Sequence, residues 1–217
     1  MEKINEKEEL KKYLIENGLH IATKSDFEAI INIVGKAYEN YPLCNYFSGG
    51  KYDEDDLKQS IQSNLNSIFN EGIIVTDSEE VNGCALLLPP GFNGFSNLSF
   101  FWNGGYKLIF RLRIKTIYRM ANFETFAMNL RKNYTNNEDW YLYNIFVNTN
   151  LKGKKISSKL IKPLLNYCKL HKKICYLETN SDNNVPIYEH FGFKVMEKCL
   201  VPNSNNVQHY AMLFDGK

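Results

Sequence analysis

Two stretches decide the fold, WYLYNIFVNTNLKGKKISSKL at residues 140–160 and ICYLETNSDNNVPIYEHFGF at residues 174–193. Residues 140–147 are almost continuously apolar, which is typical of a strand that is covered on both faces. The apolar side chains of residues 156–168 then recur at helical spacing. In the second stretch a short apolar run precedes a short helix that begins with a proline in its first turn. The predicted order is therefore strand, polar loop, helix, strand, helix.

The loop between the first strand and its helix is unusually basic. It carries Lys152, Lys154 and Lys155 around Gly153. The first turn of a helix has unpaired N–H groups and the positive end of the helix dipole, so these lysines repel the end that they surround. A bound pyrophosphate would remove that conflict, because helix N-termini bind anions. The spacing alone leaves a solvated basic loop as the alternative.

The rest of the chain alternates between helical and strand patterns. Ser25 and Glu28 have the spacing of a capping box before one of the surest helices, and Pro42 is expected to end that helix. The sequence predicts a β-hairpin that ends at Pro89. The expected helices span residues 3–17, 25–41, 54–69, 106–120 and 123–132, and the expected strands span 19–23, 72–76, 81–88, 193–197 and 208–214.

Composition narrows the class of protein. A chain of 217 residues that is 44% hydrophobic suits one globular domain, and we expect residues 1–217 to form it. The net charge of +2 gives no general attraction to nucleic acid or membrane. Five scattered cysteines indicate reduced thiols and no zinc site. The charged N-terminus is not a secretory signal, and no apolar run approaches the roughly 20 residues of a membrane span. We therefore expect a cytoplasmic protein.

Residues 91–135 are the least regular part of the sequence. Several aromatic side chains crowd a loop rich in glycine and asparagine, and a basic helical pattern follows it. Aromatic and arginine side chains together can bind nucleic acid. An amphipathic helix with a solvated basic face is the favoured interpretation, since no nucleic-acid-binding motif is present. We expect this helical insertion to shape a pocket for a substrate.

The order of elements resembles the GNAT superfamily of N-acetyltransferases over most of the chain, with residues 140–193 as the specific core. The phosphate loop of that family reads Gln or Arg, two residues, Gly, one residue, then Gly or Ala, and this chain has KGKKIS at 152–157. YLET at 176–179 and NVPIYEHFGF at 184–193 are the closer match. These runs are similar to the branch that contains puromycin N-acetyltransferase. The resemblance implies an α/β fold, a mixed, mostly antiparallel twisted sheet with helices on both faces.

The phosphate loop departs from the family pattern at two positions. Lys155 replaces a Gly and Ser157 replaces a Gly or Ala. We expect helical backbone angles at Lys155, so that its Cβ points away from the phosphates and its charge adds to the site. Ser181 replaces a frequent Asn, and Asn184 is the substitute for its hydrogen bond to the coenzyme.

The resemblance implies direct transfer from acetyl-CoA, the co-substrate, to an amine. The coenzyme would lie where the strand at 141–147 splays from the strand at 174–179, and main-chain groups of the first strand would polarise the thioester. Tyr188 occupies the position of the tyrosine acid that protonates the leaving thiolate, although a core aromatic is the alternative. The residues that the resemblance assigns to the coenzyme are Ile145, Phe146, Val147, Lys152, Gly153, Lys154, Lys155, Ile156, Ser157, Ser158, Ser181 and Asn184.

The sequence does not identify a general base. Glu124, Glu138 and Asp139 all precede the strand at 140–147, and nothing in their spacing selects one. His190 is more readily a surface histidine than a base. The cysteines have no suitably placed neighbour for a covalent route.

These observations lead to one hypothesis and two rivals. The hypothesis is an acetyl-CoA-dependent N-acetyltransferase that acts on a primary amine of a small molecule, as a monomer or homodimer. The first rival is a non-catalytic acyl-CoA-binding regulatory module, which the departures at Lys155 and Ser157 and the missing base allow. The second is an acetyltransferase of protein N-termini or lysines, which an open groove at residues 91–135 would favour.

Overall fold

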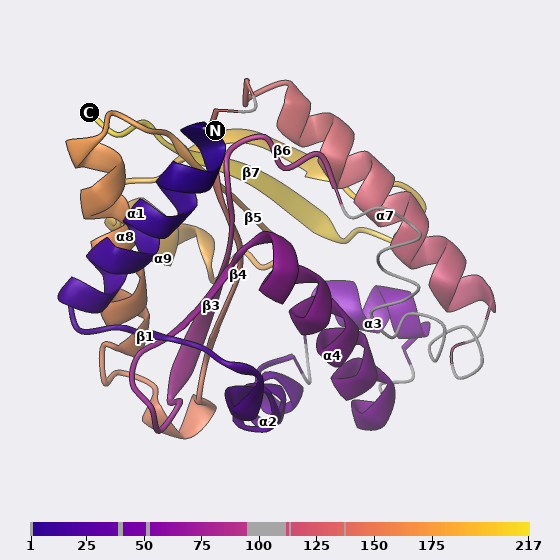
Figure 1. Ribbon diagram of the computed structural model, residues 1–217. Helices are drawn as coiled ribbons and strands as arrows, with labels where there is room; N and C mark the ends of the chain where they lie inside the picture. The colour runs from indigo at the N-terminus through magenta and orange to yellow at the C-terminus, as the bar shows by residue number, and fades with distance from the viewer. Residues whose placement is uncertain (1, 39–40, 51–52, 95–111, 113, 137) are drawn as a thin grey trace.

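The computed structural model describes the chain except residues 1, 39–40, 51–52, 95–111, 113 and 137. Within the described residues, seven strands form one open sheet in the order β1-β2-β3-β4-β5-β7-β6. β4 and β5 run parallel, and the other neighbouring strands are antiparallel (Figure 1). The strands are β1 (His20–Ile21), β2 (Ile73–Thr76), β3 (Gly83–Leu88), β4 (Trp140–Val147), β5 (Cys175–Thr179), β6 (Lys194–Leu200) and β7 (Gln208–Phe214).

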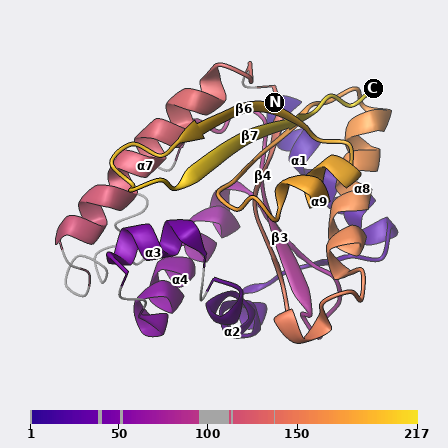
Figure 2. The same cartoon turned by 180° about the vertical axis from the view of Figure 1, so that it is seen from behind.

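Helices cover both faces of this sheet. Helices α1 and α8 pack on one face, α2 and α4 pack on the other face of β2–β4, and α7 lies over β5–β7 (Figures 1 and 2). The α-helices of the described part are α1 (Glu2–Glu16), α2 (Phe27–Ala37), α3 (Pro42–Ser48), α4 (Glu54–Glu71), α7 (Ile114–Lys132), α8 (Ile156–Leu170) and α9 (Val185–His190). Two short 3-10 helices span Lys24–Asp26 and Thr149–Leu151. The expected fold class is thus confirmed.

The central strands are apolar on both faces because each face has its own core. Along β2, Ile73 and Val75 contact the core under α1 and α8, whereas Ile74 contacts the core under α2 and α4. Successive side chains of a strand point to opposite faces, so a two-sided core needs an uninterrupted apolar run. This is why the run at 140–147 was recognisable as a strand, and β4 has those bounds.

Three local predictions are wrong. The α-helix expected from Ser25 begins at Phe27, and the capping box belongs to the 3-10 helix before it, where Asp26 accepts the Thr23 N–H at 2.7 Å. Pro42 does not end that helix, because α2 stops at Ala37 and Pro42 instead begins α3. The fixed φ of proline suits the first position of a helix as well as the end of one.

The third error concerns the basic segment, for which the sequence predicts two helices. α7 is one continuous helix that passes through Ala121 and Asn122. The part of the prediction at 106–111 and 113 lies outside the described residues, as does most of the aromatic loop.

Candidate active site

The site is organised around a fork between the two parallel strands. Their pairing comprises three residue pairs, Trp140–Cys175, Tyr141–Tyr176 and Leu142–Leu177. Beyond Leu142, β4 continues to pair with β3 as far as Val147 but is no longer paired with β5. We call the place where this pairing ends, after Leu142 and Leu177, the fork.

A β-bulge in β4 accompanies the fork. Leu142 pairs with Leu87 and Asn144 pairs with Leu86, so Tyr143 is one extra residue on β4. A bulge bends its strand and increases the local twist. The bend at Tyr143 turns the end of β4 away from β5 and leaves main-chain groups on that side for a ligand.

The expected main-chain residues lie beyond this bulge. Ile145, Phe146 and Val147 pair with β3 on one side. The Phe146 side chain is buried against α2, where its ring meets the edge of Tyr38 at 5.1 Å between centroids. Only the backbone of this segment is therefore available on the β5 side.

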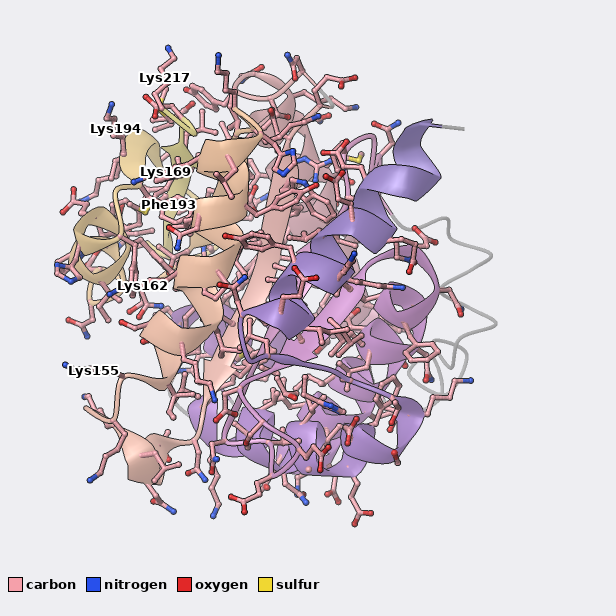
Figure 3. The ribbon with its side chains drawn as sticks, turned by 60° about the vertical axis from the view of Figure 1, so that its left-hand side comes forward. Lys155, Lys162, Lys169, Phe193, Lys194 and Lys217 are labelled. Carbon is pink, nitrogen blue, oxygen red and sulfur yellow. The ribbon has the colours of Figure 1, made fainter. Side chains whose placement is uncertain are left out.

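The lysine loop leads from β4 into α8. Lys152, Gly153, Lys154 and Lys155 are exposed, and Lys155 is the residue that precedes the first turn of α8. No side chain caps this turn, so the N–H groups of the segment Ile156–Ser158 point out of the helix toward the lysines. Lys155, Lys162 and Lys169 follow one side of α8 (Figure 3).

The backbone of Lys155 contradicts the expected right-handed helical angles. Its φ of 61° and ψ of 22° are left-handed, the region that glycine adopts without strain. The family pattern has a glycine at this position, and the lysine keeps the glycine-like conformation at a cost of roughly 1 to 2 kcal/mol. The chain therefore tolerates local strain to place a positive charge at the helix end.

Tyr38 and Tyr41, which lie within the helix expected at 25–41, reach the fork from the segment that follows α2. The Tyr38 hydroxyl donates to Asn144 Oδ1 at 2.8 Å. The Tyr41 hydroxyl accepts the Asn180 N–H at 2.8 Å, and the two tyrosine rings lie 4.9 Å apart. Together they connect β4 to the residues that follow β5.

The turn after β5 brings the remaining expected residues together. Asn184 donates from Nδ2 to Thr179 Oγ1 at 3.2 Å, and the Ser181 N–H reaches the same oxygen at 3.4 Å. The Asn184 N–H also donates to the Ser181 carbonyl at 3.0 Å. The side chain expected to bind the coenzyme thus also holds the turn.

Tyr188 on α9 is nearly buried. Its ring packs at 6.0 Å from the Phe193 ring, and 9% of the residue is exposed. Burial raises the pKa of the hydroxyl, and the nearby Tyr41 raises it further. The phenol is therefore protonated at neutral pH and able to donate a proton or hydrogen bond.

Glu178 on β5 was not singled out from the sequence. Its side chain is 9% exposed, and its carboxylate accepts the hydroxyls of Tyr176 at 2.7 Å and Tyr141 at 3.2 Å. Burial raises its pKa to about 7, and the charge of Glu124 adds to this. The only feature of the sequence that pointed to Glu178 was a carboxylate within a mainly apolar strand. Several of its neighbours in the structure, such as Tyr141 and Glu124, come from distant segments of the chain.

Of the three carboxylates that the sequence offered as bases, Glu124 is beside the fork. It lies on α7, its side chain hydrogen-bonds with Tyr143, and the surrounding protein raises its pKa although the residue is exposed to solvent. Asp139 precedes β4, where it accepts the Asn136 N–H at 3.3 Å. Glu138 is exposed.

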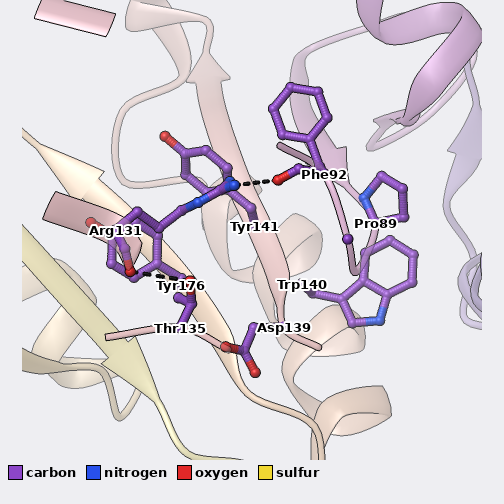
Figure 4. A pocket seen from close by; sticks show the side chains of 9 residues that line it. Pro89, Phe92, Arg131, Thr135, Asp139, Trp140, Tyr141 and Tyr176 are labelled. Carbon is purple, nitrogen blue, oxygen red and sulfur yellow. Dashed lines mark hydrogen bonds between the residues drawn. The ribbon is translucent and has the colours of Figure 1, made fainter. Parts of the chain in front are cut away.

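Two hollows are found in the described part of the structure. One, between β3, β4 and α7, has a volume of about 10 Å³, room for one water, and there the Arg131 guanidinium donates to the Phe92 carbonyl and lies over the Tyr141 ring at 4.8 Å (Figure 4). The other is a groove of about 390 Å³ beside α8 and α9, lined by Lys162, Leu165, Asn166, Lys169, His190, Phe191 and Phe214. The first is too small for a substrate.

Helices α3 and α7 lie across the same end of the molecule as the loop between β6 and β7 (Figure 2). Arg119 donates to the Tyr46 carbonyl at 2.9 Å, and the Tyr46 hydroxyl donates to the Pro202 carbonyl at 3.3 Å. Phe123 of α7 packs at 5.6 Å from Phe47 of α3. These contacts join three separate segments next to the fork.

Comparison with known proteins shows that part of this arrangement is similar to a known family. Residues 127–214, which include the fork, the lysine loop and Tyr188, match the model of the acetyltransferase (GNAT) domain. A relative from Schizosaccharomyces pombe, an uncharacterized N-acetyltransferase, is 26% identical over 187 residues, 83% of this chain and 75% of that protein. These matches support an N-acetyltransferase.

Solved GNAT structures share the fold. One, described as histone acetyltransferase HPA2 and related acetyltransferase from Corynebacterium glutamicum, has a TM-score of 0.61 at 18% identity and covers 90% of this chain and 93% of its own. Another, a putative arylalkylamine N-acetyltransferase of the yellow fever mosquito, has a TM-score of 0.62 at 12% identity and covers 92% and 87%.

The described residues lack two further kinds of feature. In that part of the chain no helix is long and apolar enough to cross a membrane. The same residues contain no group of three or more His, Cys, Asp or Glu side chains that would hold a metal ion. All five cysteines are free thiols.

Proposed function

We propose that this GNAT domain transfers an acetyl group from acetyl-CoA directly to a primary amine of a small molecule. The observation that carries the proposal is the position of the lysine loop relative to the fork. The part of β4 that is not paired with β5 runs from the fork to Val147, and the lysine loop follows it, so one extended ligand can place phosphates on the first turn of α8 and its thioester beside the bulged strand. The whole chain is proposed to act as a single domain.

The lysine loop would hold the pyrophosphate of the coenzyme. The free N–H groups at 156–158 supply donors, and Lys152, Lys154 and Lys155 supply positive charge. The pantetheine would extend along the unpaired side of β4, where the main-chain groups of residues 145–147 would hydrogen-bond with it. Ser181 and Asn184 would contact it from the turn after β5.

Transfer would occur at the fork. The amine nitrogen attacks the thioester carbon, and a β4 N–H group stabilises the oxygen that becomes negative. The bond from carbon to sulfur then breaks, and Tyr188 protonates or hydrogen-bonds the thiolate. The phenol is protonated at neutral pH, which this role requires.

A small acceptor is favoured over a protein by the contacts around α3. The Tyr46–Pro202 and Arg119–Tyr46 hydrogen bonds bridge segments that would have to separate to admit a folded protein surface. Aromatic side chains of α7, such as Phe123 and Phe126, lie on this side. The likeness to a mosquito protein described as an arylalkylamine acetyltransferase agrees with this choice, as does the resemblance to the puromycin acetyltransferase branch.

Calorimetry tests the coenzyme site. Acetyl-CoA is titrated into the wild type, Lys155→Glu and the control Lys132→Glu, which reverses an exposed charge on α7. We expect micromolar binding that weakens about tenfold, or about 1.4 kcal/mol, only for Lys155→Glu. Equal affinity for all three proteins would remove the lysine loop from the site, and no binding at all would refute the acetyl-CoA proposal.

An amine library then tests the transfer. Release of free thiol is followed for the wild type and Tyr188→Phe. We expect turnover of at least one primary amine and a fall in kcat of roughly a hundredfold or more for the variant. Binding of acetyl-CoA without turnover of any amine would favour the regulatory module.

A further inference from the structure

We propose that Glu178 is the general base that takes a proton from the acceptor ammonium group, and that Glu124 beside it makes the site selective for acceptors that arrive as cations. This inference rests on the proposed acetyl transfer and concerns the acceptor half of the same site. It fills the role of general base, for which the sequence offered three carboxylates and selected none.

The position of Glu178 relative to the fork is the first argument. It is the first residue of β5 after the last pair with β4, Leu142–Leu177. Leu177 packs under α8, so its neighbour Glu178 points to the opposite face, the one that α7 covers. An acceptor held between α7 and the fork would therefore meet this carboxylate next to the unpaired part of β4.

The charge around Glu178 is the second argument. Described groups on the neighbouring elements interact with Glu178 electrostatically or through hydrogen bonds. They are Tyr141 and Tyr143 of β4, Tyr176 of β5, Cys199 of β6, His209 of β7, Glu124 and Arg131 of α7, and Tyr41 before α3. Two carboxylates thus share one guanidinium among the described residues, so the ionised site has an excess of negative charge that favours a bound cation.

His209 does not neutralise this excess. Its Nε2 lies 3.9 Å from Glu178 Oε1, but burial lowers its pKa to about 4. Its Nδ1 lies 3.2 Å from Asn180 Nδ2, and its ring meets the edges of Phe123 and Phe126. The imidazole is therefore neutral at neutral pH, and the contact with Glu178 is not an ion pair.

Aromatic rings supply the third argument. The Tyr141 ring is 5.5 Å from both the Tyr143 and the Tyr176 rings, and all three belong to the strands that meet at the fork. Rings next to carboxylates attract organic ammonium groups, because the ring faces carry partial negative charge. Primary ammonium ions attached to an apolar group fit this surrounding better than anionic or neutral polar acceptors.

The proton balance of the reaction needs such a base. An ammonium nitrogen has no free electron pair, so it first gives one proton to the Glu178 carboxylate, directly or through a water. The neutral nitrogen then bonds to the acetyl carbon as the bond from carbon to sulfur breaks. The nitrogen loses a second proton when the amide forms, the sulfur gains one, and one proton is released to solvent.

The raised pKa of Glu178, about 7, suits this role because a base works best near the pH of the reaction. The carboxylate is the active form. The rate kcat/KM should therefore rise with pH through about 7, and fall as Glu178 becomes protonated below it.

The first test compares Glu178→Gln with the control Glu80→Gln, an exposed carboxylate between β2 and β3. The acceptors are a cationic alkylamine from the library and aniline, whose nitrogen is uncharged at neutral pH. For the alkylamine, we expect Glu178→Gln to lower kcat/KM by roughly a hundred to ten thousandfold and to move the rising limb from about pH 7 to the pKa of the amine itself. Aniline should lose far less, because it needs no deprotonation before attack.

The second test measures cation binding without catalysis. Tetramethylammonium competes with the alkylamine in the wild type, Glu124→Gln and Glu80→Gln. We expect its inhibition constant to rise about tenfold only for Glu124→Gln. This readout would not change if Glu124 had only a structural role remote from the acceptor.

The outcomes separate this inference from the proposed function. A wild type that acetylates amines, but whose Glu178→Gln variant keeps the pH 7 limb or loses aniline and alkylamine turnover equally, overturns Glu178 as the base. Inhibition by tetramethylammonium that is unchanged in Glu124→Gln overturns the selectivity for cations. A wild type that binds acetyl-CoA and acetylates no amine overturns the proposed function and this inference together.

Discussion

Replacing the buried carboxylate of Glu178 with an amide should stabilise the folded protein at alkaline pH while it slows the proposed transfer to a cationic amine. Burial raises the pKa of this group from 4.5 to about 7. Between these values the folded chain holds a proton that the unfolded chain has lost, so the free energy of unfolding falls as the pH rises. The Glu178→Gln variant cannot ionise and should escape this loss.

The size of the effect follows from the pKa shift. One pKa unit corresponds to about 1.4 kcal/mol, so the ionised side chain costs the fold about 3 kcal/mol above pH 7. The variant gives up part of the hydrogen bonding with Tyr141 and Tyr176, which costs about 1 to 2 kcal/mol. We therefore expect a net gain of roughly 1 to 2 kcal/mol at pH 8.5 and a net loss of about 1 to 2 kcal/mol at pH 5, where both side chains are neutral in the folded protein and only the lost hydrogen bonding counts.

Urea unfolding at the two pH values measures this difference. Trp140 is fully buried in β4, so its fluorescence should report the loss of the core. The free energy of unfolding of Glu178→Gln relative to the wild type should increase by roughly 3 kcal/mol from pH 5 to pH 8.5, and Glu80→Gln should show no such increase. A difference that is equal at both pH values would refute the reasoning, because it would mean that Glu178 titrates at its ordinary pKa.

Two further substitutions test the framework of the site. A Cβ on Gly83 would lie 2.7 Å from Ile156 Cγ2 and 2.9 Å from the Phe146 carbonyl, so Gly83→Ala should cost about 1 to 3 kcal/mol in thermal unfolding and also weaken acetyl-CoA binding in calorimetry. Tyr41→Phe removes the acceptor of the buried Asn180 N–H and should lower the free energy of urea unfolding by about 1 to 3 kcal/mol. Unchanged stability of Gly83→Ala would contradict the close packing around Gly83. Unchanged stability of Tyr41→Phe would contradict the hydrogen bond between Tyr41 and Asn180.

Most of the fold could be predicted because the spacing of apolar residues along the sequence reflects which side chains are buried. β4 and β7 were predicted to the residue, since each strand is a continuous apolar run bounded by polar turns. The wrong predictions concern sequence features that are compatible with two different structures. Pro42 marks a helix end or a helix start equally well, and the aromatic and basic side chains of α7 obscure its period.

The site was predictable only where its parts are neighbours in the sequence. The lysine loop concentrates three charges at one helix end, and that conflict is visible without a structure. The left-handed backbone of Lys155 was not visible, because a lysine gives no sign of the conformation that a glycine would suggest. Tyr41 and Glu178 were missed because their partners lie on other segments, such as Asn180 for Tyr41 and Tyr141 for Glu178.

Three features that lower the stability of the folded protein follow one another along the site. At one end, lysines crowd the positive end of α8 and Lys155 adopts a left-handed backbone. In the middle, β4 leaves β5 and its main-chain groups lack a strand partner. At the other end, burial raises the pKa of Glu178, and the charge of Glu124 raises it further. A phosphate, an amide-rich arm and an ammonium group would each relieve one of these costs. Acetyl-CoA and a cationic amine bound together would present a phosphate, an amide-rich arm and an ammonium group in this same order. The two ligands should therefore stabilise the protein more when both are bound than either does alone.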